Sequence, residues 1–167
     1  MSDLTLDVDG GYFIHKVGAI IIHDKSVLMV KNENHSYFYP VGGRVNFGET
    51  SECAVIREVY EETNVSFEVD RLLYIHENFF VADFLSIDNA PCHELALYYL
   101  MKQSDEIENI KCNSVGIDGG TESLHWLPIN ELSNYELFPD FYKTELRMIG
   151  DNVCHFITKD RITTCRK

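Results

Sequence analysis

The chain has 167 residues, of which 45% are hydrophobic and 25% are charged, with 27 acidic against 14 basic side chains. This length favours one domain spanning residues 1–167 and allows a substantial core. The formal net charge of −13 argues against long nucleic acid as a partner, because its phosphates would meet a repulsive field. A small phosphorylated ligand can still bind if a cation screens the acids.

The sequence gives no indication of a membrane or secreted protein. No apolar run approaches the roughly 20 residues that span a bilayer, and the first eleven residues hold three aspartates and no basic residue. Since a signal peptide needs a basic and then an apolar region, we expect a cytoplasmic location. An odd set of cysteines without a CxxC pair predicts free, buried thiols. These are Cys53, Cys92, Cys112, Cys154 and Cys165.

The N-terminal part predicts strands. Apolar runs at residues 17–22 and 27–30, parted by a polar turn, are typical of a hairpin whose first strand is central and buried on both faces. The aromatic segment 37–39 leads through Pro40 into a glycine-bearing loop.

A helix is predicted over residues 50–63. The segment contains no glycine or proline and begins with Thr50, a good N-cap residue. It ends at Asn64, which tolerates the left-handed conformation that closes many helices.

The second half predicts further strands and two short helices around a polar loop at 103–120. The expected strands are 65–69, 72–75, 79–84, 95–101, 124–127 and 153–157, and the expected helical segments are 128–132 and 139–149, before a basic tail. Strands and helices follow in mixed order, which favours an α+β fold or α/β/α layers around a mixed sheet. His76-Glu77 and His93-Glu94 are strand neighbours that point to opposite faces, so packing or surface roles are favoured over metal sites.

Three glutamates of the predicted helix face the same way. At about 100° per residue, Glu58, Glu61 and Glu62 fall within an arc of roughly 100°. Glu58 and Glu62 are a like-charge i,i+4 pair, unfavourable by roughly 0.2–0.5 kcal/mol on an isolated helix, and a divalent cation would reverse that sign. Mg²⁺ is the natural candidate, with Mn²⁺ second, because hard cations take carboxylate and phosphate oxygens. The alternative is a solvated charged face.

Two neighbouring features support a metal site. Arg57 lies four residues before Glu61 and can hold a carboxylate in place, although an exposed helical ion pair is the other reading. The glycines at 42, 43 and 48 let backbone approach a ligand closely, and a freed carbonyl there can join a metal's oxygen shell.

The stretch 43–65 resembles the Nudix box. Every spacing fits: Gly43, five residues, Glu49, seven residues, Arg57-Glu58-Val59, one residue, Glu61-Glu62, one residue, then Asn64-Val65. The one departure is Asn64, where the pattern has glycine, and asparagine is the residue that best replaces glycine at positive φ. Segments 18–22, 39–43 and 122–128 also resemble the family, so the likeness spans most of the chain.

The resemblance implies a Nudix-type α/β/α sandwich and a Mg²⁺-dependent hydrolase of a diphosphate linkage. Glu58, Glu61 and Glu62 would bind metal, with Glu58 also a candidate base for the attacking water. Glu49 and Arg57 would brace them. The Gly43 carbonyl and an acid from outside the box, for which Glu122 is the candidate, would complete the metal site.

The substrate implied is a nucleoside diphosphate linked to another group, such as a nucleotide sugar, a dinucleotide or a nucleoside triphosphate. Arg44 and Lys31, near the box in sequence, are candidates for binding substrate phosphate. The oligomeric state is open, with a homodimer as one option.

Two other functions compete. A non-catalytic nucleotide-sensing module can share the fold, although the intact glutamates argue against it. A structural or interaction domain with an acidic, solubilising helix would bind no magnesium.

Overall fold

The computed structural model describes residues 2–82, 90–111, 116 and 119–159. The strands within these residues are β1 (Thr5–Val8), β2 (Gly11–Ile20), β3 (Ile22–His23), β4 (Ser26–Asn32), β5 (Phe38–Pro40), β6 (Gly42–Arg44), β7 (Val69–Ala82), β8 (Ala90–Met101), β9 (Glu122–Pro128) and β10 (Cys154–Lys159). The helical segments are α1 (Ser51–Thr63), η2 (Ile107–Asn109), η3 (Ile129–Asn134) and α2 (Tyr142–Glu145).

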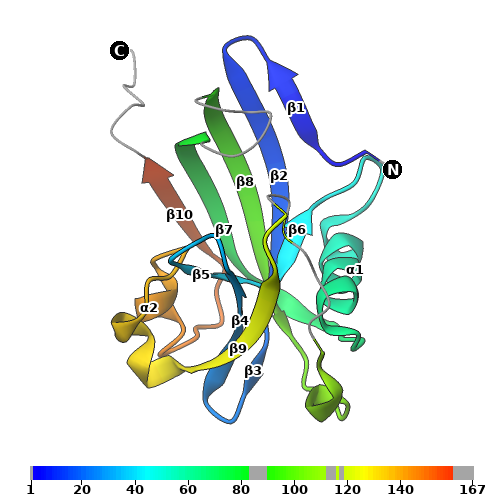
Figure 1. The fold of residues 1–167 in the computed structure, drawn as a ribbon, viewed down its shortest axis with the longest axis vertical. Helices are drawn as coiled ribbons and strands as arrows, with labels where there is room; N and C mark the ends of the chain where they lie inside the picture. Colours follow the sequence, from blue (N-terminus) through cyan, green and yellow to red (C-terminus); the bar gives the residue numbers. More distant parts are fainter. Residues whose placement is uncertain (1, 83–89, 112–115, 117–118, 160–167) are drawn as a thin grey trace.

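The larger sheet is six-stranded and mixed (Figure 1). Its order is β1-β2-β8-β7-β10, and β6 also pairs with β2. β2 runs parallel to β8, and β10 parallel to β7, whereas β1, β6 and the β7–β8 pair are antiparallel. The α+β prediction with a mixed sheet is therefore confirmed.

The smaller sheet is antiparallel and contains the predicted hairpin. β4 lies between β9 and the strands β3 and β5, and Asp24 and Lys25 turn the chain with φ of 45° and 62°. The apolar run 17–22 is not one hairpin arm, however. It splits at Ile21, so that β2 belongs to the large sheet and only the two-residue β3 pairs with β4. The end of β2 is buried, as expected for a central strand.

Helix α1 forms as the sequence predicts. The Thr50 side chain accepts a hydrogen bond from the Cys53 N–H, and Asn64 closes the helix in the left-handed region with φ of 57°. Ala54, Val55 and Val59 are fully buried in a core that they share with β2, β4 and β8. This apolar anchorage fixes which face of α1 is turned away from the core.

A second core holds η3 and α2 on the opposite side of the molecule from α1 (Figure 1). The predicted helix 139–149 is wrong in length, because α2 has only four residues. Tyr142 and Leu146 are both buried in this core, and since they are four residues apart, a single helical turn places both there. The neighbouring Phe141 ring stacks on Phe156 at 4.1 Å.

The strands of the second half are longer than predicted. Segments 72–75 and 79–82 belong to one 14-residue strand, β7, which absorbs irregular positions by register shifts near its start, whereas most of 65–69 lies before it. β8 begins at Ala90, a few residues before the His93-Glu94 pair where the sequence predicts its start. Within the loop 103–120, η2 buries Ile107. Residues 83–84, 112–115, 117–118 and the basic tail 160–167 lie outside the described residues.

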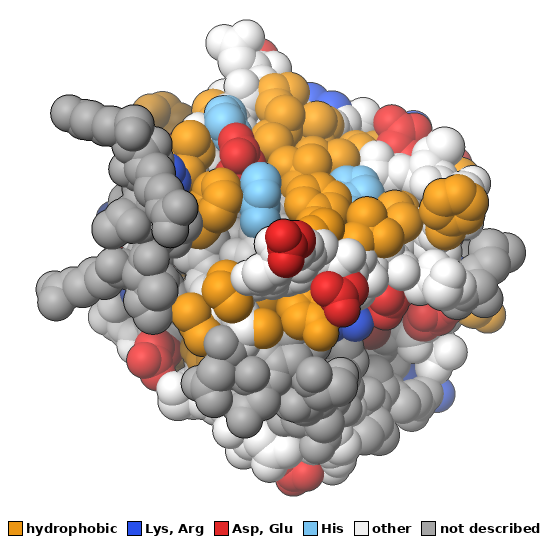
Figure 2. Space-filling model, turned by 90° about the horizontal axis from the view of Figure 1, so that it is seen from above, with side chains coloured by type: hydrophobic (Ala, Val, Ile, Leu, Met, Phe, Trp, Pro, Cys, Tyr) orange, Lys and Arg blue, Asp and Glu red, His pale blue; other side chains and the backbone are white. Residues whose placement is uncertain are grey.

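The histidines and cysteines fall into different environments. His76 is buried and stacks edge-on against Phe141, and His93 stacks on Phe79 at 4.2 Å, which agrees with packing roles. Viewed from above, hydrophobic side chains and histidines lie next to one another on the surface (Figure 2). Cys53, Cys92 and Cys154 are free, but only Cys92 is buried: Cys53 is exposed and Cys154 is half-buried, contrary to prediction. Cys112 and Cys165 lie outside the described residues.

Among the helices that the structure describes, the longest is α1 with 13 residues, and none has the length and apolar character that a membrane crossing requires.

Candidate active site

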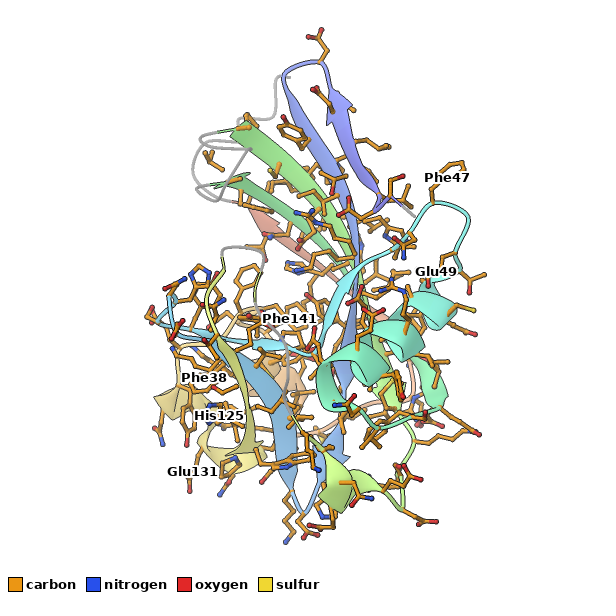
Figure 3. The ribbon with its side chains drawn as sticks, turned by 45° about the vertical axis from the view of Figure 1, so that its right-hand side comes forward. Phe38, Phe47, Glu49, His125, Glu131 and Phe141 are labelled. Carbon is orange, nitrogen blue, oxygen red and sulfur yellow. The ribbon has the colours of Figure 1, made fainter. Side chains whose placement is uncertain are left out.

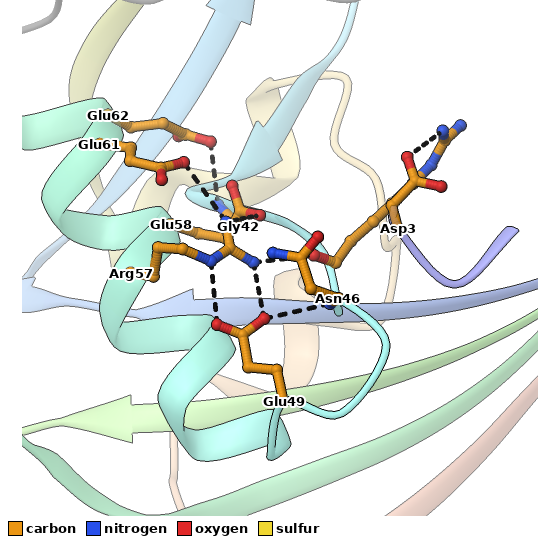
Figure 4. A network of polar contacts seen from close by, with 9 residues as sticks. Asp3, Gly42, Asn46, Glu49, Arg57, Glu58, Glu61 and Glu62 are labelled. Carbon is orange, nitrogen blue, oxygen red and sulfur yellow. Dashed lines mark hydrogen bonds and ion pairs between the residues drawn. The ribbon is translucent and has the colours of Figure 1, made fainter. Parts of the chain in front are cut away.

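Arg57 is the centre of a polar network beside α1 (Figure 4). Its Nε and Nη2 donate to the two oxygens of Glu49 at 3.0 and 2.9 Å, so this contact is bidentate. Its Nη1 donates to Glu58 Oε1 at 2.6 Å and to Glu61 Oε2 at 3.3 Å, and its Nη2 also reaches the Arg44 carbonyl at 3.1 Å. One guanidinium therefore ties the end of β6 to three carboxylates.

Glu49 lies at the start of α1, where the loop from β6 enters the helix (Figure 3). Besides Arg57, its Oε2 accepts the Asn46 backbone N–H at 3.1 Å. The hydrogen bonds from Arg57, and secondarily from Asn46, lower the pKa of Glu49 against the opposing effect of burial. This carboxylate is thus kept ionised and engaged on both oxygens, which suits a bracing role.

Glu58 packs against the glycine strand β6. A methyl group placed on Gly43 would lie 2.5 Å from Glu58 Oε2, so only glycine leaves room for this carboxylate. The side chain of Glu58 is 15% exposed. Burial raises its pKa, and the hydrogen bond from Arg57 opposes that rise.

Glu62 is the most deeply placed carboxylate of the helix. Its Oε1 accepts the Gly42 N–H at 3.3 Å, whereas its Oε2 is fully buried and has no hydrogen-bond partner among the described residues. Burial first, and then the charge of Glu122, raise its pKa well above the ordinary value, against the Gly42 N–H and the charge of Lys16.

Glu122 approaches the cluster from the other sheet. It begins β9, directly opposite Asn32 of β4, and its Oε1 accepts the Tyr39 hydroxyl at 2.7 Å. Its charge is one cause of the raised pKa of Glu62. The acid outside the helix that the sequence singled out therefore acts on Glu62 through its charge, and its part in a metal site stays a prediction.

These donors are of the kind that a hard divalent cation takes, although among the described residues no three acidic, histidine or cysteine side chains are grouped closely enough as they stand to hold a metal ion. They are oxygens only, they come from α1, β6 and β9, and two of the carboxylates have pKa values raised by burial and like charge. The orphaned Oε2 of Glu62 is costly without a partner. A cation such as Mg²⁺ would satisfy that atom and relieve the repulsion.

The remaining predicted residues are less close to the cluster. Glu61 touches Arg57, but its side chain is 56% exposed, at the rim. The Arg44 guanidinium is paired with Asp3 at 3.0 Å, so only its carbonyl enters the network. Lys31 lies 5.0 Å above the Phe38 ring. Glu122 pairs with Asn32, the residue after Lys31, and neighbouring residues of a strand point to opposite faces. The Lys31 side chain therefore lies on the face of the sheet opposite to that of Glu122.

Two residues near the cluster were missed from the sequence. The Tyr39 hydroxyl fixes Glu122, and Lys16 of β2 acts on Glu62 through its charge. A lysine inside the apolar strand 11–20 was a usable signal, because an isolated charge there needs a partner. For Tyr39 the sequence offered only an aromatic strand.

The NUDIX domain family model matches residues 14–148. The chain belongs to the Nudix family. An RNA pyrophosphohydrolase of Mannheimia succiniciproducens is 28% identical over 85% of this chain and 75% of its own length. An ADP-ribose pyrophosphatase of Methanocaldococcus jannaschii is 38% identical, but over only 37% of this chain and 38% of its own.

The Nudix fold is also seen in solved structures. A MutT protein from Methanosarcina mazei superimposes with a TM-score of 0.60 at 20% identity, covering 84% of this chain and 97% of the other. The family and its pyrophosphohydrolase members make this Nudix chain a hydrolase, and the acids around Arg57 lie in the segment that resembles the Nudix box.

Proposed function

We propose that the chain hydrolyses the diphosphate linkage of a small nucleotide, a nucleoside diphosphate joined to another group, in a reaction that requires Mg²⁺ or Mn²⁺. One observation carries the proposal: Glu58 and Glu62 are pressed against the glycines of β6, and one buried oxygen of Glu62 has no partner among the described residues. A fold rarely keeps such an atom without a use for it.

In this proposal Glu58, Glu61, Glu62 and Glu122, with the Gly43 carbonyl, hold the cation. The bound cation would neutralise diphosphate charge and acidify a coordinated water. Glu58 accepts the proton of the attacking water, because burial has already raised the pKa of this carboxylate. Arg57, itself held by the bidentate contact with Glu49, keeps Glu58 in position through the hydrogen bond from its Nη1.

The charge of the chain supports a small substrate. Its net charge of −13 disfavours long nucleic acid, although one relative is an RNA pyrophosphohydrolase. Another relative is an ADP-ribose pyrophosphatase, a name that fits a nucleoside diphosphate linked to a second moiety. Arg44 and Lys31 are given no part in the chemistry, since one is paired with Asp3 and the other faces away from Glu122.

The proposal extends to the organisation of the protein. Residues 1–167 form one domain, supported by a family match that runs through both sheets. A cytoplasmic location is supported by the free thiols at positions 53, 92 and 154. For the oligomeric state, a homodimer is kept as one option.

The test is release of nucleoside monophosphate or phosphate from nucleotide sugars, dinucleotides and nucleoside triphosphates, with and without Mg²⁺ or Mn²⁺. We expect metal-dependent release from at least one substrate, and a loss of about 100-fold or more in Glu58→Gln. Glu52→Gln, an exposed acid on the first turn of the same helix, is the matched control and should remain active.

Two outcomes would contradict the proposal. Full activity of Glu58→Gln would remove that residue from the chemistry. Nucleotide binding without release from any substrate would instead favour the sensing module.

A further inference from the structure

Two buried polar side chains face each other across the middle of the large sheet. Asn78 of β7 and Glu94 of β8 are register partners, and residue pairs in register point to the same face. They are only 3% and 6% exposed. Amides and carboxylates are seldom buried to this extent unless they are engaged.

Neither side chain has a hydrogen-bond partner within the described part of the chain. The nearest opposite charge to Glu94 is the Lys16 Nζ, at 3.9 Å, which is beyond hydrogen-bonding distance. Lys16 partly balances the charge of Glu94, and neither side chain is among those with a fully buried, unpartnered polar atom. The pair therefore keeps hydrogen-bonding capacity that a bound ligand can use.

The pair lies next to the proposed metal cluster. Lys16 of β2 connects the two: it faces Glu94 on one side, and its charge acts on Glu62 on the other. β2 pairs with β6, which carries Gly42 and Gly43, along one edge, and with β8 along the other (Figure 1). A substrate whose diphosphate is held at α1 can extend from there across β2 toward β8 and β7.

We propose that Asn78 and Glu94 recognise the base of the substrate, and that this base is guanine. The inference rests on the proposed function, because it takes the diphosphate to be bound at the α1 cluster. A carboxylate only accepts hydrogen bonds, whereas an amide can donate. The pair thus presents one donor beside two acceptors.

The Watson–Crick edge of guanine is the complement of this arrangement. Its carbonyl oxygen accepts, and its adjacent ring N–H and amino group both donate, so they can bind the two oxygens of one carboxylate. Adenine, uracil and cytosine each offer only one donor position on that edge, next to acceptors that a carboxylate repels. A phosphate group is excluded for the same reason, because like charges would meet in a buried site.

The test measures binding of GMP, AMP, UMP and CMP by calorimetry, so it needs no hydrolysis. We expect GMP to bind at least about tenfold more tightly than the other three, and Glu94→Gln to abolish this preference. Glu131→Gln, which makes the same charge change at an exposed position of η3, should retain it.

Equal affinity for the four nucleotides, no binding of any of them, or an unchanged preference in Glu94→Gln would overturn the proposal. Hydrolysis of a diphosphate without base preference would contradict only the recognition proposal. A preference for GMP without any hydrolysis would contradict only the proposed function.

Asn78→Leu separates recognition from folding. If the amide serves a ligand, replacing it with an apolar side chain of similar size should leave the thermal midpoint unchanged or raise it, while the GMP preference is lost. A clear fall in the midpoint with the preference intact would show that Asn78 serves the fold, and the proposal would fail.

Discussion

At the scale of single residues, Arg57 makes the most specific contacts of the site. Its planar fork meets both oxygens of Glu49 and also reaches Glu58, a pattern that lysine cannot reproduce. We predict that Arg57→Lys lowers kcat about ten- to hundredfold and weakens Mg²⁺ binding, with little change in thermal midpoint.

Arg71→Lys is the control for this variant, because Arg71 pairs with exposed Asp70 away from the cluster. Steady-state kinetics over a range of Mg²⁺ concentrations make the measurement. A kcat for Arg57→Lys equal to that of the control would show that Arg57 does not position the acids.

The site was predictable from sequence only as far as helix geometry reaches. The spacing of Glu58, Glu61 and Glu62 placed them on one side of α1, and the structure keeps all three beside Arg57 or the glycines. The spacing could not reveal that Glu61 is at the rim while Glu62 is deep. That difference depends on where β6 packs, and the orientation of Lys31 depends on strand register, neither of which is local.

At the scale of elements, the end of α1 can be tested directly. Asn64 occupies the left-handed region with φ of 57°, where glycine is unstrained and alanine is not. We predict that Asn64→Gly has the same thermal midpoint as the parent or a higher one, whereas Asn64→Ala loses about 1 kcal/mol of unfolding free energy. Thermal unfolding of both variants would decide this, and Asn64→Ala more stable than Asn64→Gly would contradict the account of the cap.

Elements with local signals were predicted well, and those set by long-range pairing were not. Helix α1 carries both of its caps in its own sequence. The extent of β7 depends on β8 and β10 pairing along its length. From the sequence alone, its polar positions therefore predicted breaks between separate strands. The splitting of residues 17–22 between two sheets likewise has no local mark, because Ile20, Ile21 and Ile22 are alike in sequence.

At the scale of the whole molecule, His76 of β7 joins two neighbouring strands of the large sheet and packs against the segment that leads into α2. It is fully buried, its ring lies 5.2 Å from that of Phe141, and its Nε2 bonds to Thr158 of β10 at 2.9 Å. Burial, with a contribution from His155, lowers the pKa of His76 from 6.5 to about 4.

The lowered pKa of His76 predicts acid sensitivity of the fold. Below pH 6.5 the unfolded chain binds a proton at this position that the folded chain does not take up until about pH 4. The contribution of neutral His76 to the free energy of unfolding is therefore fully present above pH 6.5. It is lost as the pH drops toward 4, by about 3 kcal/mol at most.

Denaturant unfolding between pH 7 and pH 4 should show a shallower fall for His76→Gln than for the parent, while exposed His125→Gln follows the parent. The titration of Glu58 and Glu62 is common to all three proteins and cancels in the comparison. Parallel curves for the parent and His76→Gln would contradict the prediction.

The central proposal is that the acids of α1 hold a divalent cation. Calorimetric titration of Mg²⁺ and Mn²⁺ into the parent, Glu62→Gln and Glu52→Gln tests it most directly. We predict that the parent and Glu52→Gln bind the cation and that Glu62→Gln binds it at least about tenfold more weakly, because that variant removes the buried carboxylate with the unpartnered oxygen. Equal affinity in all three proteins, or binding in none, would contradict it.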